Sequence, residues 1–284
     1  MIDPSPHRGA TPGPAFQARP IPARKLIPNV LTTIALCCGM ASVHFSIKED
    51  YQRAVAAIAV AALFDALDGR MARLLRATSR FGAVLDSLAD FLSFGVAPAL
   101  VLYQWMLGDH LRLGRSDVLG LAAVMTYVLC AALRLARFTA MSKTPQVRPT
   151  RYFVGLPSPA AAGVVLIPIM VQLSRTIETQ PPEWVVVPYT FVVGLLMVSR
   201  LPMYSIKAAR VRRQWAVPLL VIVGILVVIA IKDPWLAAIA LAGAYLATLP
   251  MSLLERRRAV RPAAAIAQDH GGGHGGGVHG TSGL

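Results

Sequence analysis

The segment Asp65–Asp90 reads DALDGRMARLLRATSRFGAVLDSLAD, and two aspartates stand at each of its ends. Asp65 and Asp68 are three residues apart, and Asp86 and Asp90 are four residues apart. Both spacings put two side chains on the same face of a helix. The apolar residues on either side predict two helices joined by a short basic connection. The four carboxylates are therefore expected to converge between two antiparallel neighbouring helices.

The composition places these helices in a membrane. Of the 284 residues, 55% are hydrophobic and only 15% are charged, which is too little charge to cover the surface of a soluble domain. The apolar runs are long enough to cross a hydrocarbon layer of roughly 30 Å. The expected fold class is all-α, a polytopic membrane helix bundle with about eight transmembrane helices. The expected spans are 29–47, 52–76, 82–108, 117–140, 153–174, 183–200, 215–231 and 234–254.

The net charge of +14 orients the chain. The basic residues form short clusters between the apolar runs, as is typical of loops on the cytoplasmic side of a membrane. With eight helices and a cytoplasmic N-terminus, most of the 28 lysines and arginines fall on that side. We therefore expect both termini to be cytoplasmic, in the cell (inner) membrane. Because the charge is spread over these loops, no nucleic-acid partner is expected.

Three regions are expected along the chain. Residues 1–26 contain prolines, glycines and basic residues without an apolar core, which predicts a disordered cytoplasmic lead-in and no cleavable signal peptide. Residues 27–254 form the transmembrane domain. Residues 255–284 are first basic and then rich in glycine and histidine, which predicts a disordered tail, with metal collection as the alternative.

Four carboxylates inside membrane helices indicate a bound cation. Acidic groups in a membrane span are costly and usually functional, and their mutual repulsion favours cations beside them. A cluster of oxygens without His or Cys suits Mg²⁺ or Mn²⁺ better than Zn²⁺, and two ions would act on phosphoryl groups. Gly69 and Gly82 leave room for a ligand or for close packing. The alternative is ion pairing with the basic residues of the segment, Arg70, Arg73, Arg76 and Arg80.

The segment resembles the signature of the CDP-alcohol phosphatidyltransferase family. The pattern D-x2-D-G-x2-A-R-x8-G-x3-D-x3-D is matched at every fixed position. The resemblance implies that Asp65, Asp68 and Asp86 bind metal and that Asp90 is a further ligand or the general base. It also implies a site for the CDP moiety, formed by Asn29, Thr32, Asp68, Gly69, Arg73 and Ser79.

Further segments resemble the phosphatidylserine synthase branch of that family. They are Asp86–Ala99, Ala132–Phe138, Phe153–Ala162 and Met197–Arg200. The branch implies transfer of a phosphatidyl group from CDP-diacylglycerol to L-serine, with release of CMP. It also implies a homodimer with its active site at the cytoplasmic face. Thr139 departs from the branch, in which asparagine is expected at this position.

The residues alone leave the acceptor open. Arg134 and Arg137 share a helix face and can bind the carboxylate of serine in a bidentate manner. The alternative for both is snorkelling to lipid phosphates. Glycerol 3-phosphate or an inositol phosphate would use the same arginines. An alternative from another class is a cation transporter, which often shows internal repeats, but the acidic motif occurs once. The last two spans, 215–254, are expected to be scaffold or dimer surface.

Overall fold

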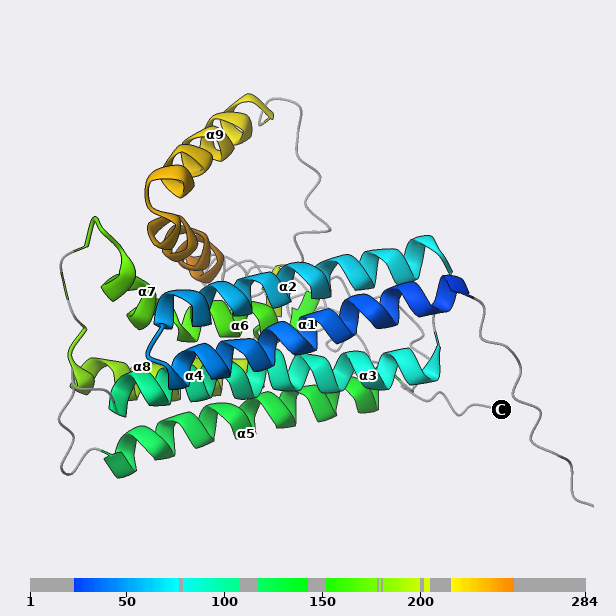
Figure 1. Cartoon of the computed structure of the whole chain (residues 1–284), viewed down its shortest axis with the longest axis horizontal. Helices are drawn as coiled ribbons and strands as arrows, with labels where there is room; N and C mark the ends of the chain where they lie inside the picture. The colour runs from blue at the N-terminus through cyan, green and yellow to red at the C-terminus, as the bar shows by residue number, and fades with distance from the viewer. Residues whose placement is uncertain are drawn as a thin grey trace, which may run out of the picture.

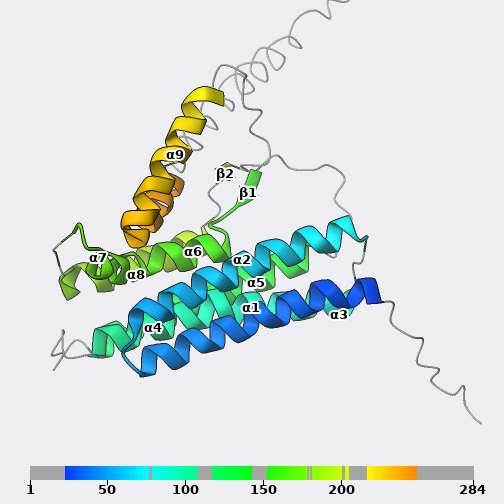
Figure 2. The same cartoon turned by 45° about the horizontal axis from the view of Figure 1, so that its top comes forward.

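The computed structural model describes residues 23–76, 79–107, 117–142, 152–177, 179, 181–199, 202–204 and 216–247. These residues form a helical bundle with one short two-stranded ribbon (Figures 1 and 2). Among them, three helices are long and apolar enough to cross a membrane, namely Leu26–Ile47, Arg80–Leu107 and Val118–Ala140. The prediction of an apolar helical bundle is confirmed. Most of the predicted lead-in 1–26 and all of the tail 255–284 lie outside the described residues.

The first half of the chain runs up and down through the bundle (Figure 1). A single rod follows the second helix, because α3, a π-helical turn and α4 join end to end. The elements are α1 (Ala23–Ile47), α2 (Tyr51–Leu74), α3 (Arg80–Asp90), η1 (Phe91–Val96), α4 (Ala97–Leu107) and α5 (Asp117–Ser142).

The second half contains shorter elements. Strands β1 and β2 pair antiparallel, with Tyr152 opposite Tyr204. Helix α9 extends away from the bundle, and the helix after it turns back (Figures 1 and 2). The elements are β1 (Tyr152–Val154), α6 (Ser158–Val165), α7 (Ile167–Leu173), α8 (Glu183–Val198), β2 (Pro202–Tyr204), α9 (Ala216–Lys232) and the unlabelled helix Pro234–Ala247.

The prediction of one helix over 153–174 is wrong. The segment begins in strand β1, and its helical part is divided at Leu166 into α6 and α7. Each of these two helices carries a proline in its first turn, where the missing N–H costs no helical hydrogen bond. Before α6, Gly155 has a φ of +83°, and an added Cβ would lie 2.6 Å from the Met197 carbonyl oxygen. The chain therefore passes over the end of α8 too closely to be helical there.

The other predicted spans agree better with the structure. Helix α1 begins at Ala23, six residues before the predicted start at residue 29, and includes Pro28. The bounds of α2, α5, α8 and α9 lie within a few residues of those predicted. The last predicted span, 234–254, is helical as far as the described residues extend.

The π-helical turn η1 lies directly after Asp90 and is held by neighbouring helices. The Tyr127 hydroxyl on α5 donates a hydrogen bond to the Phe94 carbonyl oxygen at 2.9 Å, and both residues are buried. The Ser93 hydroxyl donates to the Ala35 carbonyl oxygen on α1 at 3.2 Å. Single π-helical turns are rare in proteins, and those that occur are often found at functional sites. The turn sets the end of α3, and hence Asp90, relative to α1 and α5.

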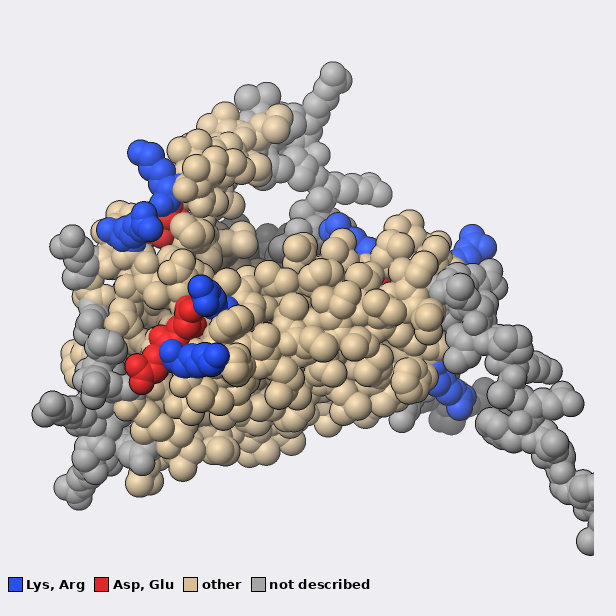
Figure 3. Space-filling view, viewed as in Figure 1, with Lys and Arg blue, Asp and Glu red and all other residues tan. Residues whose placement is uncertain are grey.

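Charged side chains lie toward the two ends of the molecule in the view of Figure 3, with a broad belt of uncharged surface between them. Many large apolar side chains on the helices are exposed, including Leu63, Leu129, Leu195 and Ile222. An exposed apolar belt of this kind is covered by lipid in a membrane protein.

Asp233 fixes the turn between α9 and the last helix. Its carboxylate accepts hydrogen bonds from the hydroxyls of Ser174 at 2.6 Å and Thr176 at 3.1 Å. It also accepts from the backbone N–H groups of Trp235 and Leu236, both at 3.1 Å, and so caps the last helix. Burial raises the pKa of Asp233, but these hydrogen bonds outweigh burial and lower the pKa from 3.8 to about 2. The residue therefore connects the end of α7 to the start of the last helix.

Asp233→Asn is expected to lower the thermal unfolding midpoint of the detergent-solubilised protein by about 5–10 °C, because hydrogen bonds to a charged acceptor are lost. The depressed pKa means that the stabilisation is present above pH of about 4 and is lost as the pH falls toward about 2. The difference in midpoint between wild type and variant should shrink over that interval.

Asp50→Asn is the matched control for this prediction. Asp50 caps α2 through one hydrogen bond from the Arg53 backbone N–H, and its ion pair is with the exposed Arg53 side chain. Its substitution should shift the midpoint less. An equal shift for the two variants would contradict the role given to Asp233.

Candidate active site

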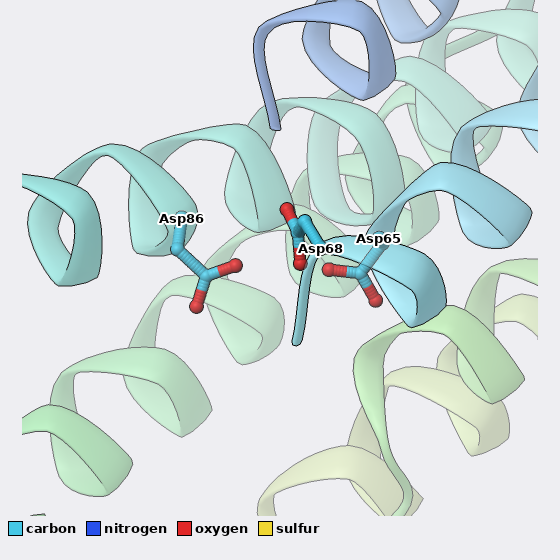
Figure 4. A group of neighbouring side chains, drawn as sticks. All are labelled: Asp65, Asp68 and Asp86. Atoms are coloured by element: carbon cyan, nitrogen blue, oxygen red, sulfur yellow. The ribbon is translucent and has the colours of Figure 1, made fainter. Parts of the chain in front are cut away.

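Three carboxylates meet between the second and third helices. Asp65 and Asp68 on α2 and Asp86 on α3 face a common space (Figure 4), and one oxygen of each lies within 4.8 Å of the others. Asp68 is buried and the other two are half-buried. Helix α1 packs against both α2 and α3, which are not themselves a closely packed pair. The predicted convergence is confirmed for these three acids, but the two helices leave a space for the carboxylates and are not packed side by side.

Asp90 lies one turn beyond Asp86, at the end of α3. Its carboxyl group is close enough to that of Asp65 to share a hydrogen bond. It is not one of the three whose oxygens lie within 4.8 Å of one another. The Arg134 guanidinium on α5 is close enough to interact electrostatically with Asp90. Asp90 therefore interacts electrostatically with both the three-carboxylate cluster and the half-buried Arg134.

The cluster is supported from the first helix. The Thr32 hydroxyl on α1 donates a hydrogen bond to Asp68 Oδ2 at 2.6 Å, and both side chains are buried. A hydroxyl that donates to one carboxylate oxygen orients that carboxylate and leaves its other oxygen for a ligand.

A cavity of about 170 Å³ opens beside the cluster. All the residues predicted to bind the CDP moiety line this cavity, except Arg73. The Arg73 side chain is exposed, and its Nε donates a hydrogen bond to the Gly69 carbonyl oxygen at 2.8 Å. The cavity walls come from α1, α2 and the start of α3: Pro28, Asn29, Thr32, Asp68, Gly69, Ala72, Ser79, Gly82, Ala83 and Asp86.

The two glycines of the motif differ in their surroundings. A Cβ added to Gly82 would lie 2.8 Å from Asn29 Oδ1 and 3.0 Å from Ser79 Oγ. The Ser79 hydroxyl accepts a hydrogen bond from the Gly82 N–H at 2.9 Å, so Ser79 also caps α3. A Cβ added to Gly69 would have no atom within 4 Å. Gly82 thus permits close packing at the cavity wall, whereas Gly69 keeps space open in it.

Arg134 is half-buried in the bundle. Its Nη1 donates a hydrogen bond to the Ser158 hydroxyl on α6 at 2.6 Å. Its Nε is buried and has no acceptor among the described residues. Arg137 lies one turn further along α5 and is half-buried. Thr139, the position that departs from the branch pattern, donates a hydrogen bond to the Leu135 carbonyl oxygen of its own helix at 2.9 Å.

The donor set fits a hard divalent cation. Among the described residues, no arginine or lysine lies within ion-pairing distance of the four aspartates. The ion pair found in this part of the chain joins Arg53 and Asp50, away from the cluster. The alternative that arginines of the motif neutralise the acids is therefore not seen in these residues. Three carboxylates within reach of one point, without nitrogen or sulfur ligands, suit Mg²⁺ or Mn²⁺.

The matches to known proteins agree with this geometry. Residues 25–196 match the family model described as CDP-alcohol phosphatidyltransferase. The chain belongs to the CDP-alcohol phosphatidyltransferase family. With its exposed apolar helices it is a membrane protein of that family. The matched range contains the acidic cluster, the cavity and Arg134, and it ends within α8.

Individual relatives within this family were also found. A CDP-diacylglycerol--serine O-phosphatidyltransferase of Mycobacterium leprae is 33% identical over 82% of this chain and 76% of its own length. A protein of the same name from Helicobacter pylori is 31% identical over 80% of this chain and 90% of its own. The crystal structure of a Mycobacterium tuberculosis phosphatidylinositol phosphate synthase with CDP-DAG bound is 22% identical, with a TM-score of 0.42 over 60% of this chain and 80% of that one.

Two contacts of the site were not predicted from the sequence. Ser158 lies in a segment that resembles the phosphatidylserine synthase branch, but no pattern connected it with Arg134. Tyr245 lies in the last helix, which was expected to be scaffold or dimer surface, and its hydroxyl is close enough to Arg134 to interact with it electrostatically. The sequence holds one weak signal for Tyr245: a tyrosine in an apolar helix usually has a polar partner.

Proposed function

We propose that this protein transfers the phosphatidyl group of CDP-diacylglycerol to the hydroxyl of L-serine and releases CMP. The observation that carries the proposal is the juxtaposition of three convergent carboxylates, a cavity beside them, and Asp90 close enough to the half-buried Arg134 to interact with it electrostatically. The names of the relatives in the family support serine as the acceptor.

The cavity between α1, α2 and α3 is the proposed site of the CDP moiety. Asn29 and Ser79 offer polar groups on one wall, and Gly69 leaves space on another. The Ser79 cap at the N-terminus of α3 points backbone N–H groups toward this region, an arrangement that favours phosphate oxygens. Arg73, on the turn after Gly69, is proposed to reach the pyrophosphate from outside the cavity.

Asp65, Asp68 and Asp86 are proposed to hold Mg²⁺ or Mn²⁺, with two ions the proposed number. Such ions, when bound, offset the negative charge of the phosphoryl oxygens. The role of Thr32 in this site is to orient the Asp68 carboxylate by donating to one of its oxygens.

Asp90 is the proposed general base. The serine hydroxyl gives its proton to the Asp90 carboxylate as its oxygen attacks the phosphorus that carries diacylglycerol. The new bond joins the serine oxygen to that phosphorus. The bond from the same phosphorus to the CMP oxygen breaks, and CMP leaves with the electron pair.

Arg134 is proposed to bind the serine carboxylate, with Arg137 on the same helix face assisting. Arg134 has a buried N–H without an acceptor among the described residues and is close enough to Asp90 to interact with it electrostatically. A guanidinium binds a carboxylate through parallel hydrogen bonds. Because the carboxylate of serine is close to its hydroxyl, Arg134 can orient serine by its carboxylate while Asp90 accepts the proton of its hydroxyl.

The active site is proposed to face the cytoplasm, in a cell (inner) membrane protein with eight crossings, both termini inside, and a homodimeric assembly. The charged ends and uncharged belt of Figure 3 support a transmembrane arrangement. The cluster of basic residues near the start of α3 supports a cytoplasmic site, because positive residues concentrate on that side.

The acceptor is tested by CMP release from CDP-diacylglycerol in detergent micelles with Mn²⁺ and a panel of acceptors. We expect release with L-serine and only background release with glycerol 3-phosphate or an inositol phosphate. Release with a phosphorylated acceptor in place of serine would keep the family reaction and contradict the serine assignment. The reaction mixture without acceptor measures hydrolysis and serves as the control.

A further inference from the structure

The last described helix, Pro234–Ala247, presents one face to the bundle. The residues on that face pack against the buried core and recur at helical spacing: Trp235, Ala238, Ile239, Ala242, Tyr245 and Leu246. Tyr245 is close to the end of this helix and twelve positions after Asp233. At 1.5 Å per residue it lies roughly 18 Å along the helix from the Asp233 turn. The phenol thus lies well along the helix from that turn, where it is close enough to Arg134 to interact with it electrostatically.

The position of Tyr245 on that face is fixed from the other end of the helix. Asp233 caps the helix through the N–H groups of Trp235 and Leu236 and is bonded to Ser174 after α7. A helix that is capped at a defined residue and packed along one face has a defined rotation about its axis. Tyr245 therefore points inward because of the fold.

Polar groups from three helices meet at Arg134. Ser158 on α6 accepts a hydrogen bond from Arg134 Nη1 at 2.6 Å, and Tyr245 on the last helix lies close enough for an electrostatic interaction. Asp90 is also close enough to the same guanidinium to interact with it electrostatically. Arg134 Nε is buried without an acceptor among the described residues. Buried donors are normally satisfied, so an acceptor from a ligand is expected at this point.

We propose that Tyr245 is a specificity-determining residue of the acceptor site, whose phenolic hydroxyl binds, together with Arg134, the carboxylate of an amino-acid acceptor. This inference rests on the proposed function and assigns the last helix a part in it. A phenol and a guanidinium are both donors toward an anion, and a planar carboxylate offers two oxygens to them. The last helix, expected to be scaffold, then forms one wall of the serine site.

The test compares serine with serinamide, which keeps the hydroxyl and the amino group but lacks the carboxylate. We measure kcat/KM for both acceptors by CMP release, using the full chain. The wild type should prefer serine strongly. Tyr245→Phe should raise the KM for serine about tenfold, the effect of one hydrogen bond to a charged group, and should leave the KM for CDP-diacylglycerol and the thermal midpoint unchanged. Its preference for serine over serinamide should fall by the same factor.

Two further variants support the interpretation. Tyr51→Phe removes a phenol that donates to the Gln104 carbonyl oxygen, and it should change neither acceptor's KM. Tyr245→His, which keeps a hydrogen-bond donor, should retain more of the preference for serine than Tyr245→Phe does. An unchanged preference in Tyr245→Phe would overturn the inference while wild-type serine activity upholds the proposed function. Absence of serine-dependent release in the wild type would instead overturn the proposed function.

Discussion

Asp90→Asn is expected to reduce kcat for serine-dependent CMP release by a factor of about 10²–10⁴, the usual contribution of a general base. The amide has the size of the carboxyl group but cannot accept the proton of the serine hydroxyl. Asp90 lies outside the group of three carboxylates with closely placed oxygens. We therefore expect Mn²⁺ binding by the variant to stay within a few-fold of wild type, as measured by electron paramagnetic resonance of free Mn²⁺.

Asp50→Asn is the control for this prediction, because Asp50 caps α2 beside exposed Arg53, outside the proposed site. It should leave kcat unchanged. If Asp90→Asn retained more than about a tenth of wild-type kcat, the base would have to be another group. If the Asp90→Asn variant lost Mn²⁺ affinity in proportion to its loss of activity, Asp90 would act as a metal ligand and not as the general base.

Asp68→Asn and Asp86→Asn are expected to abolish activity and to weaken Mn²⁺ binding at least about 100-fold, since the loss of a supporting residue alone costs 10–100-fold. Both residues belong to the three-carboxylate cluster, one from each helix. An amide supplies one neutral oxygen in place of an anionic group, so the cluster loses charge as well as a ligand. Titration of each variant with Mn²⁺, followed by paramagnetic resonance, measures the change in Kd directly.

Thr32→Val provides a graded comparison. Valine keeps the shape of threonine but cannot donate to Asp68 Oδ2. We expect Mn²⁺ binding by this variant to be weaker by about tenfold, between the wild type and Asp68→Asn. Equal Mn²⁺ affinity in the wild type and in Asp68→Asn would show that this cluster is not the metal site.

The convergence of the acids was predictable because it depends on local spacing. Asp65 and Asp68, three residues apart, had to share a face of α2, and Asp86 had to lie near the start of the next helix. The same local rule could not show that α1 fits between the two helices and supplies Thr32 to Asp68. That contact joins residues 36 positions apart, and no periodicity in the sequence encodes it.

Two features of the fold were missed for different physical reasons. The division of 153–174 into β1, α6 and α7 had local signals, in Gly155 and in the prolines of the two helix starts, which the apolar composition concealed. The π-helical turn after Asp90 had no such signal. It is held by the Tyr127 hydroxyl, a contact between helices that only the tertiary structure defines. Tyr245 carried only a weak signal, a tyrosine in an apolar helix, and its position near Arg134 is again a relation between helices that only the tertiary structure defines.

The central claim is that the serine hydroxyl oxygen attacks the phosphorus that carries diacylglycerol. The most direct measurement uses L-serine with ¹⁸O in its hydroxyl group, CDP-diacylglycerol and the purified protein, with both products analysed by mass spectrometry. We predict phosphatidylserine that retains the ¹⁸O in its phosphodiester bridge, together with an equal amount of unlabelled CMP. Labelled CMP, or CMP formed without phosphatidylserine, would contradict the claim.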